Sequence, residues 1–419
     1  MPPIRSLPLA LLLLAAGCAA PRPPAVLPPP PEALPRTQPL TLLRSATPAE
    51  AGLAAELPAR LDSLARAAVA DGTAPAVAIA VGRHGRLVHL RGYGTVDHAL
   101  GSAPVTDSTL FDLASLTKVV GTTTAAMVAE DAGLLHLDRS LGTYLPVADS
   151  AKLAVTPRLL LTHRGGFGAF TRDYRELPGR EAYLRELLAR PLPAEPGART
   201  VYRDTEMVLV QFVVEAATGQ RIDAFLRERV FRPLGMRETG FLPAVPRERI
   251  AATEVAADRG GLIWGEVHDP HAWAMGGSAG HAGLFGSARD LAVFAQMLLN
   301  GGEYGPVRVL APQTVARWTA PQVAGSSRAM GWDTPSGESS AGRFFSPRSF
   351  GHTGYTGTSM WIDPERSLFV VLLTNRVNPS ATNQRHVALR RAVADAVAES
   401  ILDAPLVDWE ARRGAARAP

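Results

Sequence analysis

The stretch Leu110–Glu130 reads LFDLASLTKVVGTTTAAMVAE, and the interpretation of the whole chain depends on it. Its apolar residues recur at helical intervals, which predicts a helix with Asp112 as N-cap and Ser115 in the first turn. In such a helix Ser115 and Lys118 share one face, so the amine can reach the hydroxyl. Free N–H groups and the positive end of the helix dipole favour an oxyanion there. The pair is therefore a candidate nucleophile with its own base.

The choice of lysine adds to this signal. Lysine and arginine together number 43, yet only Lys118 and Lys152 are lysines. Arginine keeps its proton in proteins, whereas a desolvated lysine can lose it and act as a base. The spacing alone also fits an ordinary helix with a surface lysine, so further motifs are needed.

Composition places the chain among globular proteins. It has 419 residues, of which 46% are hydrophobic and 20% charged, enough for two or three packed lobes. The net charge is only +4, and no run of arginines clusters on one predicted face. These features disfavour a nucleic-acid-binding protein.

The N-terminus predicts export. Arg5 precedes the apolar segment Leu7–Ala16, which is too short to span a bilayer, and small residues follow. Cys18, the only cysteine, stands where a bacterial lipoprotein signal would be cut and lipidated, and residues 1–18 resemble such a signal. Residues 19–45 are proline-rich and predict an extended tether. We expect a lipoprotein anchored at the periplasmic face of a membrane; alanine after the cysteine favours the outer membrane. A plain secretory signal with an incidental cysteine is the alternative.

The remaining pattern predicts one α+β domain over about residues 46–405, followed by a tail at 406–419. An antiparallel sheet built from both ends of the domain is flanked by helices, and a mostly helical subdomain is inserted between them. The sheet lobe covers about 46–115 and 301–405, the helical lobe about 116–300, and the active site is expected in the cleft where they meet. The expected strands are 76–81, 87–93, 350–356, 359–362 and 368–374, and the expected helices include 54–69, 202–218, 289–300 and 385–402.

Three motifs stand in order along the chain. They are Ser115 with Lys118, then Tyr202-Arg203-Asp204, then His352-Thr353-Gly354. Together they resemble the serine β-lactamase and penicillin-binding protein superfamily, in its class C branch with related D-peptidases and esterases.

The resemblance implies a role for each matching position. Ser115 would be acylated, Lys118 and Tyr202 would shuttle protons, and His352 would help to keep Tyr202 poised. The oxyanion would bind to the backbone N–H groups of Ser115 and Tyr355. Substrate would also contact Asp204, Thr353 and Gly354. We further expect burial to lower the affinity of Lys118 for its proton. No cofactor or metal is implied.

Two departures bear on the substrate. Asp204 stands in place of an asparagine, and an ionised aspartate cannot donate to a substrate carbonyl. His352 stands in place of the lysine of true β-lactamases, and histidine there is typical of D-peptidases and esterases. The expected function is therefore a D,D-carboxypeptidase, another D-peptidase or an esterase, acting on a peptidoglycan peptide or a small molecule. A class C-like β-lactamase and a catalytically weak peptidoglycan-binding module are the alternatives.

Two other patterns suggest rival sites. Gly276–Gly280 contains a Gly-x-Ser-x-Gly match with Ser278 as its serine, but the flanking residues do not predict the strand and helix of a nucleophile elbow. A loop carries four possible metal ligands whose spacing fits no common zinc site: His268, Asp269, His271 and His281. His163 is expected to have a structural role. No sequence feature indicates an oligomeric state.

Overall fold

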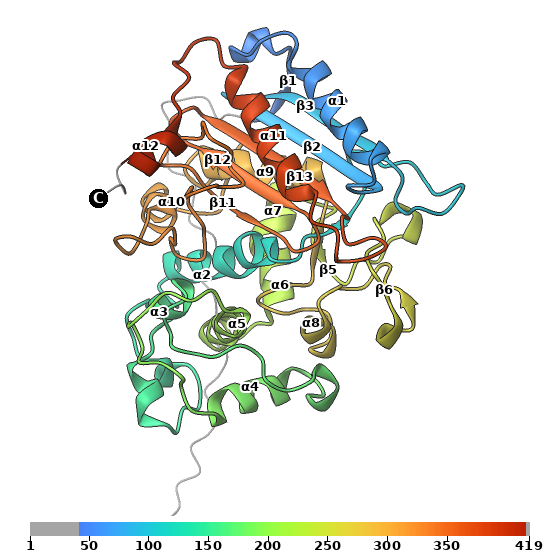
Figure 1. Cartoon of the computed structure of the whole chain (residues 1–419). Helices are drawn as coiled ribbons and strands as arrows, with labels where there is room; N and C mark the ends of the chain where they lie inside the picture. Colours follow the sequence, from blue (N-terminus) through green and yellow to red (C-terminus); the bar gives the residue numbers. More distant parts are fainter. Residues whose placement is uncertain (1–41, 416–419) are drawn as a thin grey trace, which may run out of the picture.

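The computed structural model describes residues 42–415 (Figure 1). The predicted signal segment, Cys18 and nearly all of the predicted tether lie outside the described residues. Among the described residues, no helix combines the length and the hydrophobicity that a membrane span requires.

A six-stranded sheet forms the centre of the upper region in Figure 1. It joins an N-terminal hairpin to three C-terminal strands, as predicted for a sheet made from both ends of the domain. The neighbours are antiparallel, as predicted, except that the two-residue strand at one edge pairs in parallel. The strands in spatial order are β1 (Arg44–Ser45), β3 (Arg86–Gly94), β2 (Ala76–Arg83), β13 (Leu368–Thr374), β12 (Ser359–Asp363) and β11 (Phe350–Thr353).

The ends of the folded domain differ from the predicted boundaries. Strand β1 lies within the predicted tether, where it pairs with β3. Helix α12 (Trp409–Ala415) lies within the predicted tail, and Arg391 pairs with Glu410 at 3.0 Å. Both segments belong to the domain because neighbouring elements supply their hydrogen bonds and charges.

The sheet is covered on both faces, which explains why β2 is buried throughout. Successive side chains of a strand point to opposite faces. Val77, Ile79 and Val81 pack with α1 (Leu57–Ala70) and α11 (His386–Glu399), while the alternate alanines join the larger core on the other face. Figure 1 shows α1 and α11 in front of the sheet.

Helix α9 (Ala288–Leu299) covers the opposite face of the sheet. Its buried residues, among them Leu291 and Phe294, belong to the larger core together with Phe369 of β13. The predicted helical lobe ended at residue 300 and included this helix, and that placement was wrong. The helix is strongly amphipathic, and its apolar side fits the broad alanine face of β2.

The helical region lies below the sheet in Figure 1 around α5 (Asp204–Thr218). Helix α5 is buried on nearly all sides because it contacts other helices around its circumference. The other helices are α2 (Thr124–Asp131), α3 (Pro157–Leu161), α4 (Arg180–Ala189), α6 (Ile222–Leu226), α7 (Arg232–Leu234), α8 (Pro270–Ala274) and α10 (Pro312–Thr319).

The other strands of the described residues are short and form three small sheets. The pairing of β4 with β8 places the residues just before Ser115 beside residues 285–286, which follow the Gly276–Gly280 segment. The short strands are β4 (Phe111–Asp112), β5 (Gly240–Phe241), β6 (Val255–Ala256), β7 (Gly261–Leu262), β8 (Leu284–Gly286), β9 (Glu303–Tyr304) and β10 (Val307–Arg308).

Candidate active site

Ser115 lies in the turn between β4 and a helix that begins with the π-helical segment Thr117–Thr123. The predicted N-cap was wrong, because Asp112 belongs to β4. Its two carboxylate oxygens accept hydrogen bonds from Ala114 N (2.8 Å) and His268 N (2.7 Å). Burial raises the pKa of Asp112, although these hydrogen bonds oppose the shift. Asp112 therefore ties the nucleophile turn to the loop at residue 268 instead of capping a helix.

The turn itself holds a residue in an unfavourable conformation. Ala114 has φ of 46°, a left-handed value that costs an alanine on the order of 1 kcal/mol. The turn after β11 supports it, since Thr356 Oγ1 donates to the Asp112 carbonyl (2.7 Å) and Thr358 Oγ1 to the Leu113 carbonyl (3.0 Å). These bonds direct Ser115 to the edge of the sheet.

Two side chains meet at the Ser115 hydroxyl, one from its own segment and one from a distant part of the sequence. Lys118 Nζ donates to Ser115 Oγ at 2.7 Å, and the Tyr202 hydroxyl donates to the same oxygen at 3.1 Å. The lysine comes from the next helical turn, whereas Tyr202 comes from the segment before α5. An amine and a phenol that can each accept or return the serine proton lie in contact with Ser115 Oγ. This is the arrangement of an activated nucleophile.

Lys118 is fully buried. Its Nζ lies 2.8 Å from Asp204 Oδ1 and donates to the His281 carbonyl at 3.1 Å. Burial lowers the pKa of Lys118, but Tyr202 and Asp204 outweigh it, so the net pKa is raised. The expectation of a lowered affinity for the proton was wrong, because the sequence did not reveal that Asp204 contacts this amine. Burial raises the pKa of Asp204, but the charges of Lys118 and His281 outweigh it and lower the pKa overall.

The ring of Tyr202 lies between two cations. Lys118 Nζ is 5.0 Å from the ring centroid, and the guanidinium carbon of Arg328 is 4.9 Å from it. The ring of His163 lies 4.7 Å away, and its Nδ1 accepts a hydrogen bond from Arg203 N. Burial and the charges of Arg328 and Lys118 lower the pKa of His163 to about 3, so it is neutral. It fixes the backbone next to Tyr202, in line with the expected structural role.

His352 contacts the same tyrosine. Their ring centroids are 5.8 Å apart, and among the described residues no hydrogen bond joins them. Its Nδ1 lies 2.8 Å from the Thr353 carbonyl. Burial and the charge of Arg328 lower the pKa of His352 far below its ordinary value, so the ring is neutral. The role of His352 in poising Tyr202 stays a prediction.

Gly354 allows the edge of the sheet to approach the nucleophile turn. A Cβ at this position would lie 2.1 Å from Thr358 Oγ1 and 2.5 Å from the Leu113 carbonyl. The next residue, Tyr355, lines the same cavities as Ser115. In the described part of the chain, neither the Ser115 nor the Tyr355 backbone N–H has an acceptor. Two free donors at the rim of one cavity suit an oxyanion.

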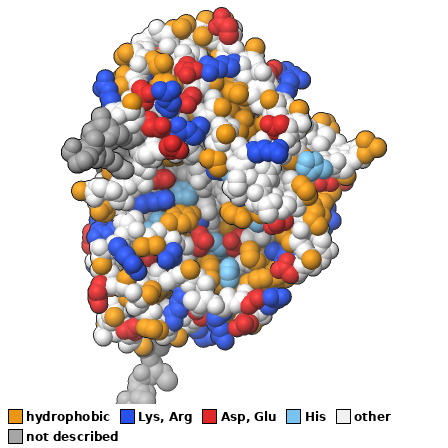
Figure 2. All heavy atoms as spheres, viewed as in Figure 1, with side chains coloured by type: hydrophobic (Ala, Val, Ile, Leu, Met, Phe, Trp, Pro, Cys, Tyr) orange, Lys and Arg blue, Asp and Glu red, His pale blue; other side chains and the backbone are white. Residues whose placement is uncertain are grey.

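The site opens into two cavities that share Ser115, Tyr202 and Tyr355. One is about 420 Å³ and includes Asp204, His268 and His281, whereas the other is about 400 Å³ and includes Thr353, Gly354 and the arginines 328, 376 and 390. Figure 2 shows a hollow in the middle of this face, with histidine and acidic side chains gathered around it. The predicted substrate-binding residues therefore all reach the cleft.

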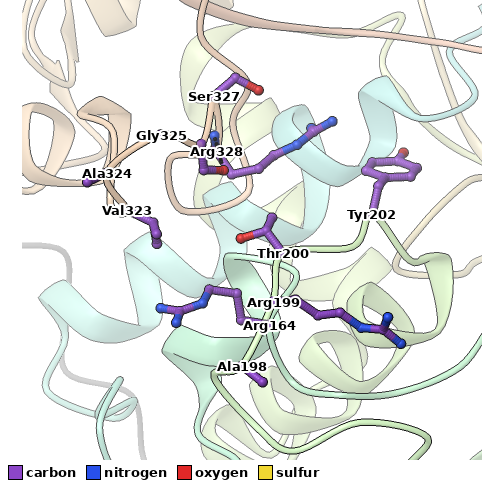
Figure 3. Close-up of a pocket in the computed structure, with 11 residues that line it drawn as sticks. Arg164, Ala198, Arg199, Thr200, Tyr202, Val323, Ala324, Gly325, Ser327 and Arg328 are labelled. Atoms are coloured by element: carbon purple, nitrogen blue, oxygen red, sulfur yellow. Dashed lines mark hydrogen bonds between the residues drawn. The ribbon is translucent and has the colours of Figure 1, made fainter.

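A further hollow of about 450 Å³ adjoins Tyr202 (Figure 3). Arg164, Arg199 and Arg328 line it, and within the described residues no aspartate or glutamate does. Figure 3 shows Arg328 reaching from this hollow toward Tyr202. These arginines were not expected from the sequence, because arginine is the common cation throughout the chain.

The structure gives no support to the rival sites. Ser278 is fully buried, and Gln211 holds the backbone just after it, because its Nε2 donates to Ser278 O and its Oε1 accepts from Gly280 N. Each loop histidine has a separate partner: His268 pairs with Glu254, His281 with Asp269, and His271 with Tyr183. Residues 42–415 contain no group of three or more candidate ligands that could hold a metal ion.

Comparison with known proteins identifies the family. The family model described as Beta-lactamase matches residues 61–395. A protein of Escherichia coli strain K12, provisionally named D-alanyl-D-alanine carboxypeptidase, is 34% identical over 351 residues, which cover 74% of this chain and 81% of that protein.

Solved structures show the same fold at lower identity. EstCE1, described as a hydrolase with promiscuous acyltransferase activity, has a TM-score of 0.66 at 23% identity, covering 82% of this chain and 98% of that one. A β-lactamase/D-alanine carboxypeptidase from Pseudomonas syringae has a TM-score of 0.66 at 20% identity, covering 81% and 98%. The chain thus has the β-lactamase/transpeptidase-like fold and belongs to the β-lactamase family of serine hydrolases.

Proposed function

We propose that this protein is a D,D-carboxypeptidase or related D-peptidase that works through a Ser115 acyl-enzyme. The observation that carries the proposal is the meeting of Lys118 Nζ and the Tyr202 hydroxyl at Ser115 Oγ. The E. coli relative, with its provisional carboxypeptidase name, supports the substrate class.

The reaction is a two-step acyl transfer. The reactive form of the enzyme is the one in which the Lys118–Tyr202 pair has lost one proton. Ser115 Oγ attacks the substrate carbonyl carbon, and the hydroxyl proton passes to this pair. The bond from carbon to the leaving nitrogen breaks, and the leaving amine takes that proton. Water then attacks the ester, gives a proton to the pair, and Ser115 regains a proton as the ester bond breaks. The products are a carboxylic acid and an amine.

During both steps negative charge develops on the carbonyl oxygen. The backbone N–H groups of Ser115 and Tyr355 are the donors proposed to bind it. Asp204 is held as a carboxylate by Lys118 and cannot donate to a substrate amide. This feature disfavours efficient β-lactam hydrolysis, and it supports an esterase as the second candidate, since an ester requires no such donor.

We also propose that lipid on Cys18 holds the domain at the periplasmic face of the outer membrane. The lipoprotein-like signal and the proline-rich segment support this location. Membrane fractionation of a bacterium that expresses the full chain should find it with the outer membrane. A Cys18→Ser variant should be found among the soluble proteins, and an unchanged distribution would contradict the anchor.

The test of function is intact-protein mass during incubation with benzylpenicillin, with a Ser115→Ala control. A lasting adduct that the control lacks would establish a penicillin-recognising site and favour the D,D-carboxypeptidase. If no adduct forms, hydrolysis of D-alanyl-D-alanine peptides and of p-nitrophenyl esters by both proteins decides between the two candidates. Ester hydrolysis that survives in Ser115→Ala would overturn the assignment of the nucleophile.

A further inference from the structure

Two buried arginines lie behind the turn that carries Tyr355. Arg390 of α11 donates from Nη2 to the carbonyls of Gly354 and Thr358, at 2.6 Å each. Arg376, just after β13, donates from Nε to the Tyr355 carbonyl at 2.8 Å, and its guanidinium carbon lies 4.4 Å from the Tyr355 ring centroid. Both carbonyl groups that flank the Tyr355 N–H are therefore bonded to a cation.

Neither arginine pairs directly with a carboxylate among the described residues, although the more distant charge of Glu254 partly opposes the lowering of the Arg376 pKa by burial. Arg376 is 2% exposed and Arg390 is 7% exposed, and no carboxylate lies within 4.0 Å of either guanidinium in residues 42–415. Burial lowers the pKa of Arg390 to about 9, and the neighbouring Arg376 adds to this effect. Two buried cations without a directly paired carboxylate are costly to the folded state. Neutral hydrogen-bond donors could hold the turn in place with a smaller desolvation penalty, so holding the turn does not by itself explain two arginines here.

The position of the Gly354 carbonyl suggests a function for the two arginines. This carbonyl and the Tyr355 N–H belong to one peptide unit, so a cation at the oxygen withdraws electron density from the N–H and strengthens it as a donor. The same cations place positive potential behind the cavity where the oxyanion forms. We propose that Arg390 and Arg376 are positioning residues that aim and polarise the Tyr355 N–H for the transition state. This inference rests on the proposed Ser115 acyl transfer.

The chain offers a matched control on the same helix. Arg391 follows Arg390, but its guanidinium points to Ser339 and Glu410, away from the Tyr355 turn. The variants Arg390→Gln, Arg390→Lys, Arg376→Gln and Arg391→Gln can be compared with the full protein. The measurements are kcat and KM for a p-nitrophenyl ester, the Ki of 3-aminophenylboronic acid, and the melting temperature. The boronate forms a tetrahedral adduct on serine and so reports oxyanion binding separately from substrate binding.

We expect Arg390→Gln to lower kcat by about 10- to 100-fold, somewhat less than the loss of an oxyanion donor itself. KM should change little, and the Ki of the boronate should rise by a factor similar to the loss in kcat/KM. Arg390→Lys keeps a cation near the Gly354 carbonyl and should retain more activity than Arg390→Gln. Arg376→Gln should show a smaller loss of the same kind, and Arg391→Gln should resemble the unmodified protein.

The proposal is overturned if a folded Arg390→Gln or Arg376→Gln variant keeps its kcat and boronate Ki while only its melting temperature falls, since that is a purely structural role. Should Arg390→Gln fail to fold, Arg376→Gln and Arg390→Lys supply the same test. Failure of the proposed function looks different, because the unmodified protein would then hydrolyse no ester in a Ser115-dependent way.

Discussion

The charge of Lys118 depends on a single neighbouring carboxylate. Asp204 Oδ1 lies 2.8 Å from Nζ, and together with Tyr202 it raises the pKa of the amine despite full burial. A lysine that remains protonated at rest stabilises negative charge well but accepts a proton poorly. The aspartate that takes the place of the family's asparagine therefore affects proton transfer as well as substrate recognition.

Asp204→Asn should move the acidic limb of the kcat/KM profile to lower pH. Removing the carboxylate lowers the pKa of Lys118, so the form of the Lys118–Tyr202 pair with one fewer proton appears at a lower pH. The measurement is ester hydrolysis from pH 5 to 10. Asp149→Asn is the matched control, because Asp149 contacts the other buried lysine, Lys152, at 2.7 Å outside the site. A limb that stays in place in Asp204→Asn would contradict the electrostatic role.

Gly354→Ala should lower kcat by at least about 100-fold, because displacing a reacting group by 1 Å can have this effect. The added Cβ would push the edge of the sheet away from Leu113, only 2.5 Å from the methyl position. Ester kinetics and the melting temperature should be measured together. Gly240→Ala is the control, since its Cβ meets nothing within 4 Å. Activity near that of the unmodified protein would show that the close approach is not needed.

At the level of elements, α5 is attached to the His163 loop by one buried carboxylate. Glu206, in the first turn of α5, is 1% exposed and accepts hydrogen bonds from Gly165 N (3.1 Å) and Phe167 N (3.2 Å). Burial outweighs these bonds and raises the pKa of Glu206 to about 8 from 4.5. Between pH 4.5 and about 8, Glu206 therefore keeps its proton in the folded protein, whereas the same side chain is ionised in the unfolded chain.

The folded protein should lose stability as pH rises across this range. Because the pKa of Glu206 is higher in the folded protein than in the unfolded chain, its contribution to the stability of the folded protein is fully present below pH 4.5. This contribution is lost as the pH rises to about 8. The free energy of unfolding in urea should fall by about 1.4 kcal/mol per pH unit from this group. Glu206→Gln should flatten the dependence, whereas the exposed Glu181→Gln should not. Equal slopes in Glu206→Gln and the unmodified protein would contradict the assignment.

On the scale of the whole molecule, the cleft lies where the edge of the sheet meets the helical region. Tyr202 forms part of both this cleft and the cationic hollow lined by Arg164, Arg199 and Arg328 (Figure 3). Positive charge next to a catalytic group favours substrates that carry a carboxylate, and salt screens such an effect.

The protein should therefore prefer the mono-p-nitrophenyl ester of glutaric acid over neutral p-nitrophenyl valerate. Raising the salt from 20 to 500 mM should reduce this preference, and Arg199→Gln should lower the ratio of the two kcat/KM values by about threefold. Arg172→Gln is the control, because Arg172 pairs with Glu176 outside the hollow. An unchanged ratio in Arg199→Gln would show that the hollow does not contact substrate.

The sequence by itself determined the family, the α+β fold and the order of the three motifs. These follow from local signals, since Ser115 and Lys118 lie within one helical turn and the short, continuous apolar runs of β2 and β13 indicate strands buried on both faces. Only the tertiary structure decided which residues meet. Asp204 reaches Lys118, α9 packs on the sheet, and Arg390 contacts the turn at Gly354 from 36 residues further along the chain. The charge of Lys118 could not be predicted for the same reason, because a pKa depends on burial and on neighbours that folding brings together.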